Sequence, residues 1–192
     1  MSSDETAVIR YIVDASQSKF TVQAFATGLL SGFGHNPTIA IRDYTGEVQC
    51  TQGFLTNASV RLETKTDSLI VIDDVKEKDR QEIESLMHST VLETARYPEI
   101  LFQSTNITVT RIAEGRYKAR IIGELTLHGV TRGSLWIHAQ VKVTEGKMRA
   151  QGEFTLKQTD YNIKRVSVAG GALRLKDELK FTFDMLANQE QA

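Results

Sequence analysis

Apolar and polar residues alternate with a period of two along much of the chain. Between residues 117 and 127 the odd positions are apolar or small, and most even positions are polar. The same alternation returns over 135–143 and 148–156. Successive side chains on a strand point to opposite faces of the sheet, so this pattern is typical of half-buried strands. We predict three antiparallel strands joined by turns at 128–133 and 144–147.

The register of these two hairpins follows from keeping the apolar residues on one face. Centring the first hairpin on Thr131 places Gly123 opposite Ala139. Centring the second between Glu145 and Gly146 places Ala139 opposite Gly152. A slip of one residue would send every apolar side chain to the other face. The pattern therefore predicts an inward-facing row of small residues across three strands.

Further strands are predicted from shorter stretches of the same kind. They cover residues 8–14, 19–25, 38–42, 46–51, 58–66, 99–110 and 179–186. Within 99–110 the apolar residues change face between Phe102 and Ile107, which predicts a β-bulge.

Two segments break the strand pattern. Residues 73–88 are rich in charge, with an incomplete apolar stripe, and Asp74 followed by Glu77 resembles a capping box. We predict a helix there and a second short helix over 91–96, because a helix ends before the residue preceding Pro98.

Eight or more antiparallel strands in one domain, taken as residues 1–192, indicate a closed barrel or a sandwich. The row of small residues favours a barrel with an apolar cavity, and such cavities suit lipid-like ligands. A second interpretation remains open: the small residues bend the strands or let a helix pack closely.

Composition narrows the classes of function. The net charge of −1 argues against a nucleic-acid-binding protein, and the single cysteine, Cys50, excludes an intrachain disulfide. No apolar run approaches the roughly 20 residues that span a bilayer. The polar, acidic start lacks the features of a secretory signal, so we expect a cytoplasmic protein.

Candidate chemistry is sparse. His35 and Asn36 end a glycine-rich loop and could bind a ligand head group or satisfy the loop backbone, and His128 in a tight turn is a weaker head-group candidate. The four histidines lack metal-ligand spacing, so we expect neither a metal nor another cofactor. No Gly-x-Ser-x-Gly motif is present, and Cys50 has no evident histidine partner. We therefore assign no catalytic residue.

Three motifs, in order along residues 9–187, resemble those of the YceI-like family of lipocalin-like polyisoprenoid-binding proteins. The first is Tyr11-Ile12-Val13-Asp14 followed by residues 18–22. The second is Tyr-Pro-Glu-Ile-Leu-Phe-Gln-Ser at 97–104. The third is Gly-Glu-Leu-Thr-Leu-His-Gly-Val-Thr at 123–131.

This resemblance implies an all-β fold: an eight-stranded antiparallel lipocalin-like barrel with one or two short helices between strands. It also implies an apolar channel for an amphiphilic, isoprenoid-type ligand. The residues expected to line that channel are Phe20, Val22, Ile39, Ile41, Leu62, Phe102, Leu125, Leu127, Ile137, Phe154, Phe181 and Phe183.

Three functions are compatible with the sequence. The first is a protein that carries or sequesters an amphiphilic lipid. The second is a ligand-free dimeric interaction module that uses Trp136, which the register places on the outer face. The third is an enzyme acting on a bound lipid, with His35 or His128 as the acid–base group. We rank them in that order.

Overall fold

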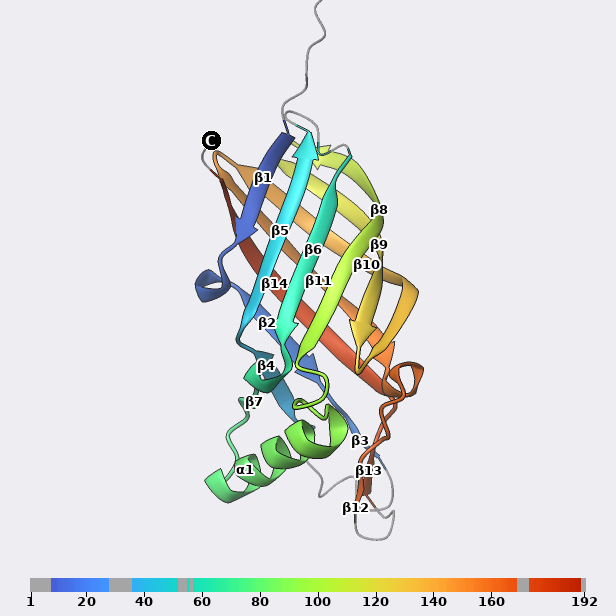
Figure 1. Ribbon diagram of the computed structural model, residues 1–192. Coiled ribbons are helices and arrows are strands. Elements are labelled where there is room, and N and C mark those ends of the chain that lie inside the picture. The colour runs from blue at the N-terminus through green and yellow to red at the C-terminus, as the bar shows by residue number, and fades with distance from the viewer. Residues whose placement is uncertain (1–7, 28–35, 52–54, 56, 169–172, 191–192) are drawn as a thin grey trace, which may run out of the picture.

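Eight antiparallel strands form a closed barrel in the computed structural model, which describes residues 8–27, 36–51, 55, 57–168 and 173–190 (Figure 1). Each strand pairs with its neighbour around the ring, and β1 pairs with β14 to close it. This confirms the all-β, eight-stranded fold. In order around the ring, the strands are β1 (Val8–Val13), β5 (Tyr44–Thr51), β6 (Ser59–Lys65), β8 (Glu99–Ala113), β9 (Arg116–Leu127), β10 (Val130–Thr144), β11 (Lys147–Lys157) and β14 (Glu178–Gln189).

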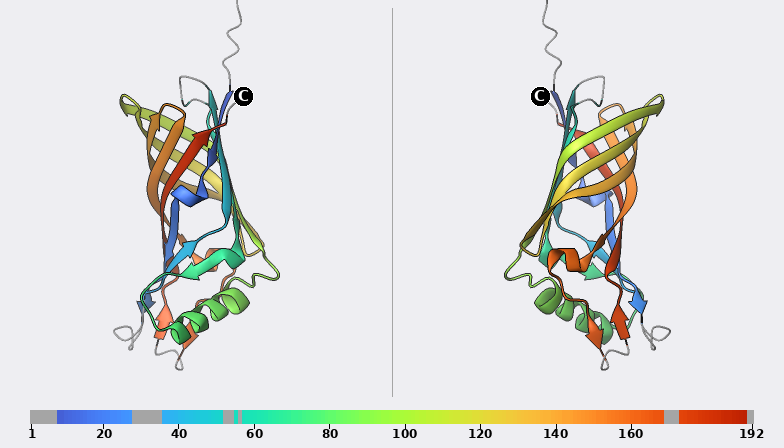
Figure 2. Two further views of the ribbon diagram at one scale, coloured as in Figure 1. Left: turned by 90° about the vertical axis from the view of Figure 1, so that its left-hand side faces the viewer. Right: turned by 90° about the vertical axis from the view of Figure 1, so that its right-hand side faces the viewer.

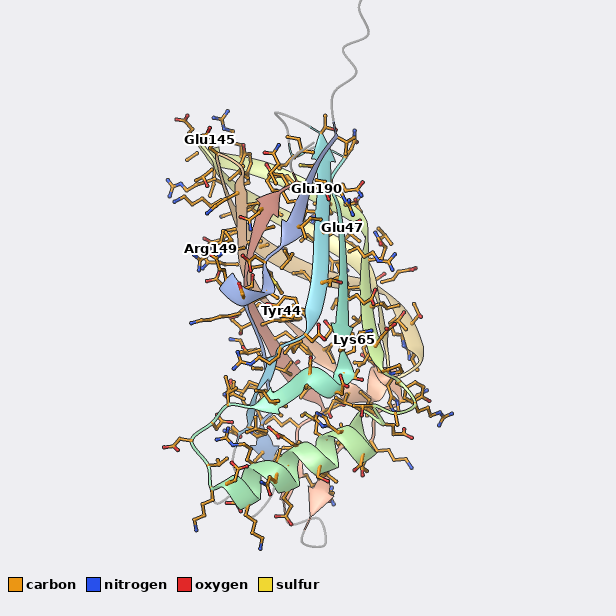
Figure 3. All side chains as sticks on the ribbon, turned by 60° about the vertical axis from the view of Figure 1, so that its left-hand side comes forward. Tyr44, Glu47, Lys65, Glu145, Arg149 and Glu190 are labelled. Atoms are coloured by element: carbon orange, nitrogen blue, oxygen red, sulfur yellow. The ribbon has the colours of Figure 1, made fainter. Side chains whose placement is uncertain are left out.

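Shorter elements extend one end of the barrel, called here the lower end, as drawn in Figures 1 and 2. The strand β2 pairs with β14, and β4 and β7 follow it in the same sheet, while β12, β13 and β3 form a separate small sheet. The turn that contains Glu145 marks the opposite, upper end (Figure 3). The lower elements are β2 (Lys19–Gln23), β3 (Ala26–Thr27), β4 (Thr38–Ile41), β7 (Leu69–Val71), α1 (Glu77–Leu86), the π-helical η3 (Met87–Val91), β12 (Ser167–Val168) and β13 (Leu173–Leu175).

Three short 3-10 helices connect strands: η1 (Ala15–Gln17), η2 (Thr66–Ser68) and η4 (Gln158–Tyr161). The first of them is capped by Asp14, whose carboxylate accepts a hydrogen bond from the Ser16 N–H group. It joins β1 to β2, so that both strands lie along β14.

The two predicted hairpins differ in outcome. In β10–β11, Ala139 lies opposite Gly152, which confirms the predicted register. In β9–β10 the predicted register is wrong: Gly123 lies opposite Leu135, and Ala139 lies opposite Ala119. The turn is the two residues His128 and Gly129, both with positive φ (52° and 73°), as a tight hairpin turn requires.

A shift in register between Arg132 and Leu135 then places the odd-numbered residues of the two strands opposite each other, as in the pairs Leu135–Gly123 and Ile137–Ile121. Strand β10 therefore begins at Val130, earlier than predicted. The predicted bulge in the 99–110 strand is confirmed, since the β8–β9 register shifts between Ser104 and Asn106.

The helices also differ from expectation. Helix α1 begins after Lys76 without a side-chain cap, so the capping box of Asp74 and Glu77 is not formed. The neighbouring Asp73 instead accepts a hydrogen bond from the Thr38 N–H group at 2.6 Å. The second predicted helix, 91–96, is wrong, because the chain leaves η3 and turns at Glu93 with a φ of 46°.

Candidate functional site

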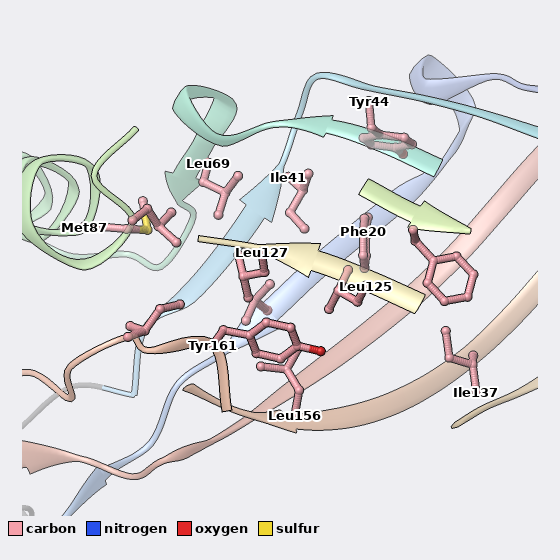
Figure 4. Close-up of a cluster of buried hydrophobic side chains, with 14 residues drawn as sticks. Phe20, Ile41, Tyr44, Leu69, Met87, Leu125, Leu127, Ile137, Leu156 and Tyr161 are labelled. Atoms are coloured by element: carbon pink, nitrogen blue, oxygen red, sulfur yellow. The ribbon is translucent and has the colours of Figure 1, made fainter. Parts of the chain in front are cut away.

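The barrel encloses a cavity of about 610 Å³. Small-molecule sites occupy roughly 300–1,000 Å³, so this volume suits an organic ligand. All twelve residues named from the family resemblance lie along it. Figure 4 shows part of the lining, with Phe20, Leu125 and Leu156 coming from different strands. That these side chains contact a ligand stays a prediction.

Aromatic rings form one wall of the cavity. Phe154 and Phe181 stack with centroids 4.8 Å apart, and Phe20 lies 6.2 Å from Phe181. Phe181 and Phe183 come from β14, whereas Phe154 comes from the neighbouring β11. Stacked rings give a rigid apolar surface against which a hydrocarbon chain can pack.

The small residues do not create the cavity in the way the sequence suggested. A Cβ atom on Gly123 would lie 2.5 Å from the Phe102 ring, and one on Gly152 would lie 2.6 Å from the Phe183 ring. Both glycines are therefore covered by aromatic side chains, which neither interpretation of the small residues predicted. Among the small residues, Ala139 and Ala150 do line the cavity.

Among the residues the structure describes, few charged side chains belong to the lining. Asp79 and Glu82 of α1 and Arg174 of β13 lie at the lower end, and Glu47 and Arg61 come from β5 and β6. The rest of the lining is almost entirely apolar. A ligand with an apolar chain and a polar head would fit this distribution, because a buried unpaired polar group is costly.

Side chains from α1 and η3 cover the free edge of β7. Glu84 Oε1 accepts a hydrogen bond from the Val71 N–H group at 2.7 Å, and Arg80 Nη1 donates to the Val71 carbonyl oxygen at 3.1 Å. The Nε2 atom of His88 lies 2.8 Å from the Leu69 carbonyl oxygen. The helix thus closes the lower end without being part of the barrel wall.

Sequence reasoning missed this part of the cavity. Ile83, Leu86 and Met87 line it from α1 and η3. They belong to the apolar stripe from which the helix is predicted. The sequence does not indicate that this stripe faces the cavity. Val166 and Leu175 also line the cavity, next to β12 and within β13.

Asn36 and His128, the two predicted head-group residues that the structure describes, do not line the cavity. His128 Nε2 is 2.7 Å from Glu93 Oε2, its Nδ1 is 3.3 Å from the Tyr161 carbonyl oxygen, and its ring packs on Tyr97 with centroids 4.4 Å apart. Both ring nitrogens thus face protein acceptors. Asn36 Oδ1 accepts from the Ala26 N–H group at 2.7 Å, and His35 lies outside the described residues.

Groups for catalysis are equally sparse in the described part of the chain. Burial raises the pKa of the Cys50 thiol, which disfavours the reactive thiolate. Across the described ranges, no group of three or more His, Cys, Asp or Glu side chains could hold a metal ion. Among the same residues, no helix has the length and apolarity that crossing a membrane requires.

Trp136 is 51% exposed, with the Arg120 guanidinium 5.7 Å from the centre of its ring. This agrees with the outward orientation predicted from the register. A dimer built on this surface stays a prediction.

Solved structures share this fold at low sequence identity. BcnA of Burkholderia cenocepacia superposes with a TM-score of 0.69 at 14% identity, covering 92% of this chain and 99% of that one. A polyisoprenoid-binding domain from Saccharophagus degradans, implicated in plant cell wall breakdown, gives 0.65 at 15%, covering 94% and 98%. The YCEI protein of Campylobacter jejuni gives 0.62 at 15%, covering 82% and 88%.

No curated protein matches the chain. The profile of the YceI-like domain matches residues 11–187, which is most of the sequence. The order of the strands, the apolar interior and this match agree, and the chain belongs to the YceI-like family.

Proposed function

We propose that the protein binds an amphiphilic, isoprenoid-type lipid in the barrel and carries or sequesters it, as a binding protein rather than an enzyme. The observation that carries this proposal is the continuous apolar lining of the 610 Å³ cavity. Burial of each CH₂ group contributes roughly 0.8 kcal/mol, so a long chain can bind tightly with few polar contacts.

The family supports the choice of ligand class. The superposable domain from Saccharophagus degradans is named as polyisoprenoid-binding. The stacked rings of Phe154 and Phe181 would pack well against the flat double bonds of an isoprenoid chain. A cytoplasmic location remains a prediction from the sequence.

The proposal is tested by the lipid content of the purified protein. Native mass spectrometry and solvent extraction should find a chain-like lipid with the wild-type protein. Ala150→Phe adds a ring inside the cavity, which Ala150 lines, and should displace that lipid while the far-ultraviolet circular dichroism is kept. Filling empty volume should leave the melting temperature unchanged or raised.

The matched control is Gln151→Phe, which adds the same ring at the next, exposed position of β11. Its lipid content should equal that of the wild type. Equal lipid content in the Ala150→Phe variant would contradict a ligand inside the barrel.

A further inference from the structure

One segment at the lower end of the barrel carries a concentrated positive charge. Between residues 162 and 176 the chain has four cations, Lys164, Arg165, Arg174 and Lys176, and no acidic residue. We call the described parts of this segment, 162–168 and 173–176, the basic arm. Because the whole chain has a net charge of −1, the remainder is net negative. The arm is therefore opposite in sign to the rest of the chain taken as a whole.

The basic arm has two different faces. All four cationic residues are exposed. Val166 and Leu175, in contrast, line the cavity, and they are tied together because the Leu175 N–H group donates to the Val166 carbonyl oxygen at 3.0 Å. The cations thus lie beside an apolar surface that continues into the barrel.

The position of the arm is fixed by its neighbours. Strand β13 pairs with β3, and the Lys176 N–H group donates to the Phe25 carbonyl oxygen at 2.8 Å. In both views of Figure 2 the sheet of β12, β13 and β3 lies at the same end of the barrel as α1. The arm is consequently attached to the barrel at the cavity's lower end.

Nearby acids offset only part of this charge: Asp177 interacts electrostatically with Arg165, and the four cations of the arm still leave a positive excess. Asp177, which follows it, accepts hydrogen bonds from the Thr159 N–H group (2.9 Å) and hydroxyl (2.6 Å). Asp79 and Glu82 lie on α1, another element of the lower end. The lower end therefore has a basic side formed by the arm and acidic side chains on α1.

We propose that the basic arm docks the lower end of the barrel onto the surface of an anionic lipid bilayer. Clusters of four or more Lys and Arg residues are attracted to anionic membranes over a distance set by the salt concentration. Docking would place the apolar face of Val166 and Leu175 against the bilayer, which gives a lipid chain a dry route to the cavity. The role in lipid transfer rests on the proposed function, whereas the surface attraction itself does not.

Flotation with lipid vesicles tests the docking. The wild-type protein should float with vesicles of equal parts phosphatidylcholine and phosphatidylglycerol, should not float with phosphatidylcholine alone, and should be released by high salt. The triple variant Lys164→Gln, Arg165→Gln and Lys176→Gln should weaken binding about tenfold or more. Arg174 is retained in this variant because it also lines the cavity.

A charge-matched control removes three cations from the upper end: Arg116→Gln, Lys142→Gln and Lys147→Gln. Lys142 lies opposite Arg116, and Lys147 lies opposite Thr144 beside the turn that Figure 3 marks with Glu145. This control should bind anionic vesicles like the wild type. A second variant, Lys164→Glu with Arg165→Glu, checks the result without touching the arm's contact to Phe25.

Several outcomes would overturn the docking proposal: no flotation with anionic vesicles, equal flotation with neutral vesicles, or equal losses in the arm variant and the upper-end control. Retention on heparin without flotation would also overturn it and would favour an acidic protein partner. Lipid content measured on the same preparations separates the two proposals. Protein without a bound lipid that still floats supports docking and contradicts the proposed function.

Discussion

The wall of the barrel and its lower end are held together by different kinds of interaction. In the wall, strands β8 to β11 and β14 are joined by long main-chain ladders, with inward side chains packed around the cavity. At the lower end, β7 has three residues, and among the described strands it pairs only with β4. Its other edge is satisfied by the side chains of Glu84, Arg80 and His88.

This difference has a consequence for dynamics. A ladder of many hydrogen bonds breaks cooperatively, whereas a few side-chain contacts can separate while the rest of the fold is intact. We therefore expect α1 to detach from β7 at a lower free energy than global unfolding. Because Ile83 and Leu86 of α1 line the cavity, such opening would admit a ligand.

The largest expected effect is in the wall. A Cβ atom on Gly152 would lie 2.3 Å from the His138 carbonyl oxygen of the paired strand, as well as against Phe183. Since a ladder carbonyl has little room to move, Gly152→Ala should lower the free energy of unfolding by about 2 kcal/mol, as measured by urea denaturation.

The control is Gly133→Ala, because a Cβ there would meet only Glu124 Oε1, at 4.0 Å. It should change stability by less than about 0.5 kcal/mol. Equal losses of unfolding free energy in the two variants would show that the paired strands of the wall adjust to the added Cβ atom at position 152.

The sequence predicts the wall better than the lower end, for a physical reason. Alternation with a period of two fixes which face is buried, and so it identifies cavity residues such as Leu125 and Ile137. It does not detect slips by an even number of residues, which explains the wrong pairing of Gly123 with Ala139. The bulge that corrects the β9–β10 register involves Gly133 and Ser134, the latter with a φ of 68°.

At the lower end the local pattern is too short to be informative. Strand β7 consists of Leu69, Ile70 and Val71, and the sequence predicts no strand there. The hydrogen bond between His128 and Glu93 joins residues 35 positions apart, and no periodicity indicates it. Such contacts depend on the tertiary fold, and from the sequence only the position of His128 in a tight turn suggests a role in head-group binding.

The next effect is smaller and confined to the lower end. Glu84→Ala removes the acceptor of the buried Val71 N–H group, which a new water molecule would satisfy only incompletely. Hydrogen exchange of that amide should accelerate by a factor of about five to ten, which corresponds to roughly 1 kcal/mol. Amides in β9 to β11 should exchange as in the wild type.

Glu82→Ala is the matched control on the same helix, because Glu82 lies at the lower end of the cavity and not on the edge of β7. Its Val71 amide should keep the wild-type protection. If Glu84→Ala accelerated exchange equally in α1 and throughout the wall, the lower end would not be a separate unit.

The smallest effect concerns side-chain contacts on the outside of the wall. Hydrogen bonds from Arg149 to Asp184 hold the pKa of the Asp184 carboxyl below its usual value. A lowered folded-state pKa stabilises the protein above the unfolded pKa of about 3.9, and this contribution is lost as the pH falls through the folded value. Asp184→Asn should therefore reduce stability slightly at neutral pH, and the difference from the wild type should vanish in acid.

Urea unfolding of both proteins from neutral pH down to acid checks this pH dependence, with Glu145→Gln in the exposed upper turn as the control. A loss as large as that of Gly152→Ala would mean that the wall, like the lower end, depends on side-chain contacts, and the contrast between the two regions would fail.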